Sequence, residues 1–243
     1  MQRPNVILLS RHDMVLAVAK ICRKHEETYY GIIREHDVLP PGSFPNIVAS
    51  EDNLVIFSNV PAFSPRVKTL KDALDEKLDA KLIKSALAQI IALLIYAHSR
   101  DPRFAHNDLK ADNILLTKTS NEFLVIGEHE IETHGVAVVF IDFETVTGTR
   151  FPKFKVETTK KNLMDFGLDD SLPFSPWTDL HLVFMEVVRY DVPGFSEFIQ
   201  HFYPLDHFKT LNPLVTSQNR LNARGRLLNT PLPNLLLDPF FEN

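Results

Sequence analysis

Three shortages in the 243-residue sequence limit what the protein can be. It has one cysteine, Cys22, so a disulfide within the chain is excluded and a reducing compartment is favoured. No apolar run approaches the roughly 20 residues that cross a membrane, and the apolar run at 6–9 is too short for the core of a signal peptide. Glycine is scarce, and none occurs before Gly31. We therefore expect a soluble intracellular protein, in the cytoplasm, that lacks a glycine-rich loop near its start.

The charge balance excludes a further class of partner. The net charge is −5, which leaves no basic footprint, so we do not expect nucleic acid as a partner. The short apolar runs make a membrane partner unexpected as well. A hydrophobic content of 44% and a charged content of 23% are ordinary for a globular protein. At this length the chain fits one large domain or two lobes that share a cleft, and its oligomeric state is left open.

Hydrophobic periodicity divides the chain into a β-rich beginning and a more helical remainder. Strands are predicted by short apolar runs at 6–10, 14–21, 47–49 and 54–57, and a helix by the spacing within 24–39. From about residue 68 the pattern predicts two helices, then strands near 113–116, 123–126 and 136–141, then a buried helix from Asp179. The predicted fold class is α+β, with a small β-rich lobe that contains one helix and a larger α-rich lobe that carries a β-ribbon.

The segment 106–116, HNDLKADNILL, holds the residues best suited to chemistry. One residue separates Asp108 from Lys110, so an extended loop would direct both side chains into the same space, and Asn113 enters the next strand. A carboxylate, an amine and an amide that converge with an aspartate at a strand end suit phosphoryl transfer. Asp108 would accept the proton of the substrate hydroxyl, and Lys110 would offset charge on the moving phosphoryl group. Asn113 and a later aspartate would hold Mg²⁺.

Two Asp-Phe pairs compete for the role of that later aspartate. Asp142 follows an unbroken apolar run, 136–141, which predicts a buried strand that ends opposite the 106–113 loop. Asp165 follows a polar stretch and only two apolar residues, so no strand would bring it to a buried site. We therefore predict Asp142 as the metal ligand and 165–167 as a loop or a helix end.

The 106–113 segment also resembles a known family. It is similar to the catalytic loop of protein kinases, H-R-D-L-x-x-x-N, through His106, Asp108, Leu109, Lys110 and Asn113. Lys110 is typical of the serine/threonine branch. The family's Arg, which receives a phosphorylated activation loop, is replaced by Asn107. Activation by that route is therefore not expected.

This resemblance implies a single protein-kinase-like domain, with an N-lobe of residues 1–60 and a C-lobe of residues 61–243. The expected activity is phosphoryl transfer from ATP, with Mg²⁺, to serine or threonine hydroxyls of a protein substrate. The compact chain also looks similar to kinases of large DNA viruses, which would place it in a host cell or a virion.

Other site residues follow from the resemblance. Residues 17–20 resemble the family's V-A-I-K strand, so Lys20 would contact the nucleotide phosphates and pair with Glu35, with Glu26 or Glu27 as alternatives. Asn113 and Asp142 would bind Mg²⁺ and, through it, the nucleotide. Asp179 follows Asp142 by 37 residues and resembles the family's aspartate that braces the catalytic loop.

Departures from the family pattern keep two other functions open. The missing glycine-rich loop suits a pseudokinase scaffold, because only 19 residues precede Lys20 and none is glycine. The sequences H-N-D and I-D-F-E also occur in small-molecule phosphotransferases such as choline kinases. Glu144 replaces the family's glycine after Asp-Phe, and because a side chain restricts positive φ, we expect a less switchable loop there.

Overall fold

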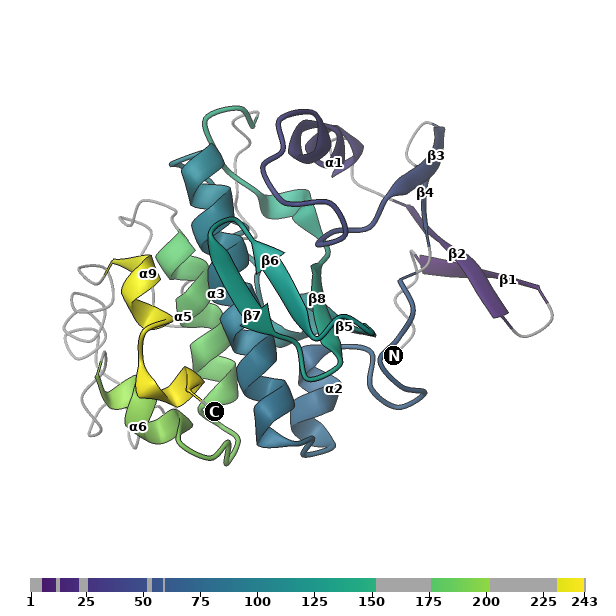
Figure 1. Ribbon diagram of the computed structural model, residues 1–243. Helices are drawn as coiled ribbons and strands as arrows, with labels where there is room; N and C mark the ends of the chain where they lie inside the picture. The colour runs from purple at the N-terminus through teal and green to yellow at the C-terminus, as the bar shows by residue number, and fades with distance from the viewer. Residues whose placement is uncertain are drawn as a thin grey trace, which may run out of the picture.

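The computed structural model describes residues 6–11, 14–21, 26–51, 54–58, 60–151, 176–201 and 231–242 (Figure 1). Its elements, in chain order, are β1 (Val6–Arg11), β2 (Met14–Ile21), α1 (Glu26–Glu35), β3 (Ile47–Glu51), β4 (Leu54–Ser58), α2 (Leu70–Asp75), α3 (Ala80–Arg100), η1 (Ala111–Asn113), β5 (Ile114–Lys118), β6 (Phe123–Ile126), β7 (His129–Glu132), β8 (Val136–Phe140), η2 (Phe143–Thr145), α5 (Pro176–Val187), α6 (Phe195–Gln200), α9 (Leu232–Leu235) and η3 (Pro239–Phe241).

The first four strands form one antiparallel sheet in the order β1-β2-β4-β3. Helix α1 contributes Tyr29, Tyr30 and Ile33 to the core, and all three are buried. This helix ends at Glu35, before the predicted end at residue 39, because Asp37 adopts a left-handed φ of 49° that cannot continue a helix. The N-lobe is thus a sheet with one helix, as predicted.

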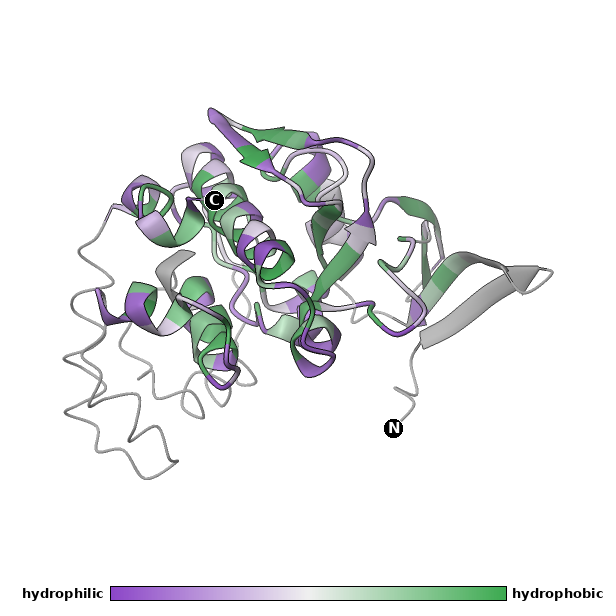
Figure 2. Cartoon of the chain, turned by 60° about the horizontal axis from the view of Figure 1, so that its bottom comes forward, coloured by the Kyte–Doolittle hydropathy of each residue, from purple (hydrophilic) through white to green (hydrophobic). Residues whose placement is uncertain are grey.

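Helix α3 is the central element of the C-lobe (Figure 1). Its N-cap is Asp79, whose side chain accepts a hydrogen bond from the Lys81 N–H. By length and composition α3 could cross a membrane, but 72% of its most apolar window is buried inside the protein, as in the core helix of a globular domain. The helices of the C-lobe carry both hydrophobic and hydrophilic residues (Figure 2), which fits elements with one face in a core.

Two antiparallel ribbons, β5–β8 and β6–β7, lie against α3. The buried Gln89 of α3 bonds to the backbone of β8 at two points. Its Nε2 donates to the Val136 carbonyl at 2.9 Å, and its Oε1 accepts from the Val138 N–H at 3.0 Å. Because buried backbone groups need partners, these bonds hold β8 at one position along α3. They therefore also set the position of the residues that follow β8.

The predicted α+β class is confirmed, since a sheet with one helix precedes a mainly helical part that carries a β-ribbon. A single hydrophobic cluster runs through both lobes and includes Tyr30 and Phe57 on one side and Leu87 and Phe140 on the other. The two lobes therefore share buried surface beside the predicted site.

Candidate functional site

Strand pairing brings two predicted metal ligands to the same end of the β5–β8 ribbon. Ile114, the first residue of β5, is opposite Phe140, the last residue of β8. The Ile141 N–H donates to the Asn113 carbonyl at 3.0 Å, so Asn113 and Asp142 flank the end of the ribbon. Asp142 adopts φ 68° and ψ 57°, a left-handed conformation that few residues other than glycine occupy and that clusters at functional sites.

Asp108, Lys110 and Asn113 converge as the sequence predicted. The Asn113 Nδ2 donates to the Asp108 carbonyl at 2.8 Å and to its Oδ2 at 2.9 Å. The Lys110 Nζ lies 2.9 Å from the same Oδ2. Asn113 is fully buried, and its Oδ1 has no hydrogen-bond partner in the part of the chain that the structure describes. An amide oxygen with no protein partner in a buried site is available to a ligand.

Lys20 reaches this group from the N-lobe. Its Nζ donates to the Asp142 Oδ1 at 2.5 Å, and only 22% of the Lys20 side chain and 15% of the Asp142 side chain are exposed. The ion pair connects β2, in the N-lobe, with the residue that follows β8, in the C-lobe. Lys20, Asp108, Lys110, Asn113 and Asp142 therefore form one site at the junction of the lobes.

The structure does not bring Glu35 to Lys20. Glu35 is exposed at the end of α1 and forms no ion pair within the described residues. The reason is helical periodicity, because the face of α1 that contacts the site carries Tyr30, and a residue five positions later points well away from that face. Of the two alternatives, Glu27 accepts a hydrogen bond from Ser50 on β3. The side chain of Glu26 lies outside the described residues, as does the whole of the rival segment 165–167.

The positive φ that glycine would favour lies elsewhere than at Glu144. The positive φ falls on Asp142, whereas Glu144 lies within the right-handed turn η2, which a residue with a side chain adopts without strain. Glu144 is therefore compatible with the observed backbone, and the expectation of a less switchable loop stays a prediction.

Asp179 braces residues 106–113 from within α5; this segment is called the catalytic loop because it resembles that loop of protein kinases. Its Oδ2 accepts from the His106 N–H and its Oδ1 from the Asn107 N–H, both at 2.7 Å. Burial raises the pKa of Asp179 to about 7, and the two backbone donors oppose that rise. Burial also lowers the pKa of His106, so the ring is neutral at pH 7 and its Nε2 donates to the Ile141 carbonyl at 2.9 Å.

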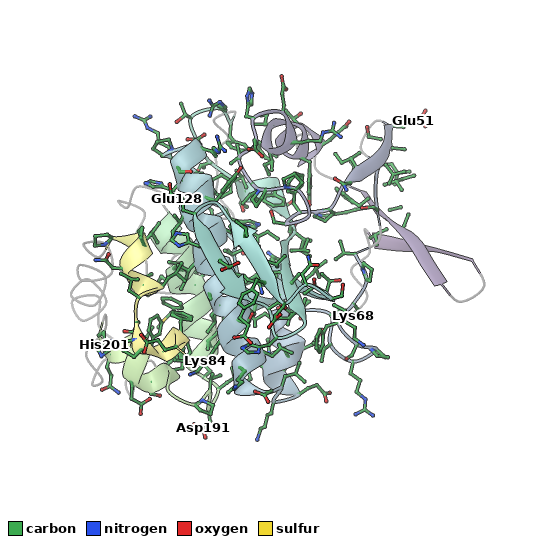
Figure 3. All side chains as sticks on the ribbon, viewed as in Figure 1. Glu51, Lys68, Lys84, Glu128, Asp191 and His201 are labelled. Atoms are coloured by element: carbon green, nitrogen blue, oxygen red, sulfur yellow. The ribbon has the colours of Figure 1, made fainter. Side chains whose placement is uncertain are left out.

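We expect Asp179→Ala to destabilise the protein substantially. The change leaves two buried N–H groups without acceptors, at a cost of about 1–3 kcal/mol each, although some of this is offset because a buried charge is removed. Thermal unfolding of Asp179→Ala and of Asp191→Ala would measure the effect, since Asp191 is exposed (Figure 3). Equal melting temperatures for the two variants would contradict the bracing role.

Asn107 joins the catalytic loop to the segment that follows Asp142. It adopts a left-handed φ of 65°, and its Nδ2 donates to the Thr145 carbonyl at 2.8 Å and to the Thr147 Oγ1 at 3.0 Å. The Thr145 hydroxyl donates to the His106 carbonyl at 2.8 Å. Ala105 and Thr147 also exchange two backbone hydrogen bonds of 2.9 and 3.0 Å. Asn107, which stands where the kinase pattern has Arg, therefore links the two segments through its hydrogen bonds.

The same segment is anchored again at Asp101, the C-cap of α3. Burial raises the pKa of Asp101, but hydrogen bonds from the backbone and side chain of Thr149 and from two other backbone N–H groups together hold it below its ordinary value. Glycine suits position 148, because a Cβ there would lie 2.7 Å from the Asp101 Oδ2 and 2.6 Å from the Phe151 ring, and one of these side chains would have to move. The chain beyond Asp142 is thus fixed to the end of α3.

Four rings form a column from the catalytic loop into the N-lobe. The centroid of His106 lies 4.9 Å from that of Phe143, and Phe143 lies 5.0 Å from Tyr30 of α1 in an edge-on arrangement. Tyr30 lies 4.8 Å from Phe57 of β4. This aromatic column (His106, Phe143, Tyr30 and Phe57) packs the residue next to Asp142 between the two lobes.

A pocket of about 220 Å³ opens beside the ion pair of Lys20 and Asp142. Its apolar walls come from both lobes, with Val18 and Phe57 on one side and Leu115 and Ile141 on the other. A larger pocket of about 420 Å³ lies between α3, the β6–β7 hairpin and the C-terminal residues, and it contains none of the predicted site residues. The smaller pocket is the one whose position suits a flat apolar group next to the charged site.

Known proteins with a similar sequence or fold include a viral protein and a solved structure. No family model matches the chain. It is 25% identical over 177 residues to a protein of Acanthamoeba polyphaga mimivirus named "Putative serine/threonine-protein kinase R400". In sequence, the chain resembles a protein kinase. The match covers 63% of the chain and 36% of that relative, so the chain spans about a third of the relative's length. A solved structure of WaaP in complex with acyl carrier protein aligns with 98% of the chain and 81% of its own, at 12% identity and a TM-score of 0.42.

Two features of this site were not predicted from the sequence. The partners of Phe143 in the aromatic column come from α1 and β4, and no local pattern pairs such distant residues. Glu186 of α5 accepts a hydrogen bond from the Ala111 N–H of the catalytic loop. A signal for Glu186 was present, because it follows Asp179 by seven residues, which is two helical turns on the same face of one helix.

Proposed function

We propose that the protein transfers a phosphoryl group from ATP, with Mg²⁺, to serine or threonine hydroxyls of a protein substrate. The observation that carries this proposal is the meeting of Asp108, Lys110 and Asn113 with the Lys20–Asp142 ion pair beside a pocket between two lobes. The similarity to a mimivirus protein named as a serine/threonine kinase supports the direction of the proposal, and so does Lys110.

The residues of the site fit Mg²⁺. Among the described residues there is no cluster of three or more His, Cys, Asp or Glu side chains that could hold a metal. Mg²⁺ does not require such a cluster, because it binds through one or two protein oxygens, with waters and phosphate oxygens as the remaining ligands. The unpartnered Oδ1 of Asn113 and the carboxylate of Asp142 supply such oxygens. Bound Mg²⁺ would offset the charge of the nucleotide phosphates.

Each residue then has one task. The adenine would lie between the apolar walls of the 220 Å³ pocket, and Lys20 would bind the phosphates next to it. Asp108 would orient the substrate hydroxyl and accept its proton, while Lys110, 2.9 Å from Asp108, would offset charge on the transferred group. The hydrogen bonds from the backbone to Asp179 would hold this geometry before any ligand binds. Less free energy is then needed to order the site for the reaction.

The missing glycine-rich loop should affect the affinity for ATP more than the phosphoryl-transfer step. In protein kinases the glycine-rich loop covers the ATP phosphates, whereas here β1 and β2 pair as far as Arg11 opposite Met14. Fewer backbone N–H groups can approach the phosphates there than in a glycine-rich loop, so Lys20 and Mg²⁺ must carry more of the phosphate binding. We infer that nucleotide binding depends strongly on the metal.

Thermal unfolding with and without millimolar ATP and Mg²⁺ tests the proposal. At 100 times the dissociation constant the ligand should stabilise the wild type by about 2.7 kcal/mol. Asp142→Asn should lose this stabilisation, because it removes the charged metal ligand and the partner of Lys20. Asp165→Asn, at the rival Asp-Phe pair, should keep it.

Each contrary outcome has a clear meaning. No shift in the wild type at high nucleotide would refute ATP binding and favour a scaffold. A shift lost in Asp165→Asn and kept in Asp142→Asn would assign the metal to the other aspartate. Stabilisation by ATP and Mg²⁺ with phosphoryl transfer to small alcohols such as choline, and none to protein or peptide acceptors, would show that the substrate is a small molecule.

A further inference from the structure

We infer that Glu186 is a positioning residue for phosphoryl transfer, which fixes the second half of the catalytic loop through its hydrogen bond with the Ala111 N–H. The inference rests on the proposed function and deepens it. Glu186 would not touch substrate or nucleotide, and would act through Lys110 and Asn113, the residues on either side of the Ala111 turn.

Helix α5 holds the catalytic loop at two points. Asp179 accepts the N–H groups of His106 and Asn107 at the start of the loop. Glu186 accepts the N–H of Ala111 near its end. Seven residues are close to two turns of an α-helix, so both carboxylates project from the same face of α5. The helix thus acts as a template with an acceptor for each end of the loop.

Glu186 accepts a hydrogen bond from a backbone N–H group, that of Ala111, which has no acceptor within the loop itself. Ala111 is fully buried and begins η1, and the first N–H groups of a helical turn have no partner within that turn. The loop's own bonds run from the Lys110 N–H to the Asp108 carbonyl at 2.9 Å and from the Asn113 N–H to the Lys110 carbonyl at 2.8 Å. Without Glu186 the Ala111 N–H would be buried and unpaired, and the turn would have to rotate to satisfy it.

Rotation of this turn would disturb the chemistry directly. Lys110 and Asn113 both contact the Asp108 Oδ2, at 2.9 Å each, and they reach it from opposite ends of the Ala111 turn. A small shift of the turn would move both contacts together, along with the free Asn113 oxygen. The walls of the nucleotide pocket come from other residues, so the shift should act on the catalytic loop and leave the apolar pocket intact.

The surroundings of Glu186 raise its pKa above the ordinary value. Burial raises its pKa, the hydrogen bond from Ala111 opposes the rise, and Asp112 adds to it, while Arg189 and Lys110 oppose it. Glu186 therefore lies within the field of Lys110, the side chain it is inferred to help place.

Three variants of the full chain test the inference, with exposed Glu197→Ala as the control. Glu186→Ala removes the acceptor, Glu186→Asp keeps the charge but shortens the side chain, and Glu186→Gln keeps an acceptor oxygen without the charge. Amide exchange of the 106–113 segment and steady-state ATP turnover are measured for each.

We expect Ala and Asp at position 186 to accelerate exchange of the 106–113 segment. They should lower kcat roughly 10- to 100-fold, the usual effect of losing a partner that orients a functional ligand. Glu186→Gln should resemble the wild type in both measurements. This result would separate positioning from a general loss of stability. A general loss of stability would not spare Glu186→Gln while impairing Glu186→Asp.

Unchanged exchange in Glu186→Ala, wild-type behaviour of Glu186→Asp, or a fall in kcat shared by Glu186→Gln would overturn the inference. A rise in KM for ATP in place of the fall in kcat would also overturn it. If the wild type neither binds nor turns over ATP, the proposed function fails separately, and the exchange rates of the same variants still decide whether Glu186 fixes the loop.

Discussion

Asp108→Asn should reduce phosphoryl transfer by about 10²- to 10⁴-fold, the range that a positioned general base contributes. Asparagine has nearly the same shape and keeps an oxygen for Asn113, which lies 2.9 Å from the Asp108 carboxylate, but it cannot accept the proton of the attacking hydroxyl. Phosphate release and transfer to peptide acceptors would measure the loss. Asp112→Asn, an exposed change four residues along the same loop, is the control.

Nucleotide binding should survive this change. The contacts assigned to the phosphates and the metal belong to Lys20, Asn113 and Asp142, and the apolar pocket does not include Asp108. Asp108→Asn should therefore keep the stabilisation by ATP and Mg²⁺ that Asp142→Asn loses. If Asp108→Asn retained full transfer activity, Asp108 would not be the base, and the assignment of the whole 106–113 loop would be wrong.

Phe143→Ala should have the largest effect on stability, about 3–5 kcal/mol, as is typical for removal of a buried phenyl ring. The ring is fully buried between His106 of the C-lobe and Tyr30 of the N-lobe, so its loss leaves a cavity where the two lobes meet. Denaturant unfolding would measure the change in free energy. Phe123→Ala is a suitable control, because 46% of Phe123 is exposed and little packing is lost there.

The same variant should also weaken nucleotide binding. Phe143 follows Asp142 directly, and its packing helps to hold Asp142 in the left-handed conformation from which it meets Lys20. Phe143→Leu retains most of the apolar volume and should recover much of the stability. A Phe143→Ala protein as stable as Phe123→Ala would show that the aromatic column does not join the lobes.

Local sequence was sufficient for the parts of the site that depend on neighbours in the chain. Asp108, Lys110 and Asn113 lie within six residues, so their convergence follows from the geometry of one loop and the strand after it. Asp142 was placed correctly at the end of a strand because an unbroken apolar run has few alternatives to a buried strand. The contact of Asp179 with the catalytic loop came from the kinase resemblance, and the structure contains it.

Long-range geometry accounts for what the sequence could not provide. Glu35 was chosen by its spacing from the following strand, but spacing does not say which face of α1 turns toward Lys20. That face is decided by Tyr30, which packs on Phe143 more than 100 residues away in the chain. The acceptor role of Glu186 likewise depends on how α5 crosses the loop, and helical periodicity gives its direction only after Asp179 has been placed.

The bonds of Asn107, Thr145, Thr147 and Asp101 have a consequence for how the protein unfolds. Irregular segments usually open independently, at free energies well below that of global unfolding. Here the irregular backbone on both sides of the site is bonded to α3, to α5 and to itself, so it cannot open without breaking contacts of the buried helices. Catalytic loop and core therefore belong to one cooperative unit, and the site should persist up to the temperature at which the core itself melts.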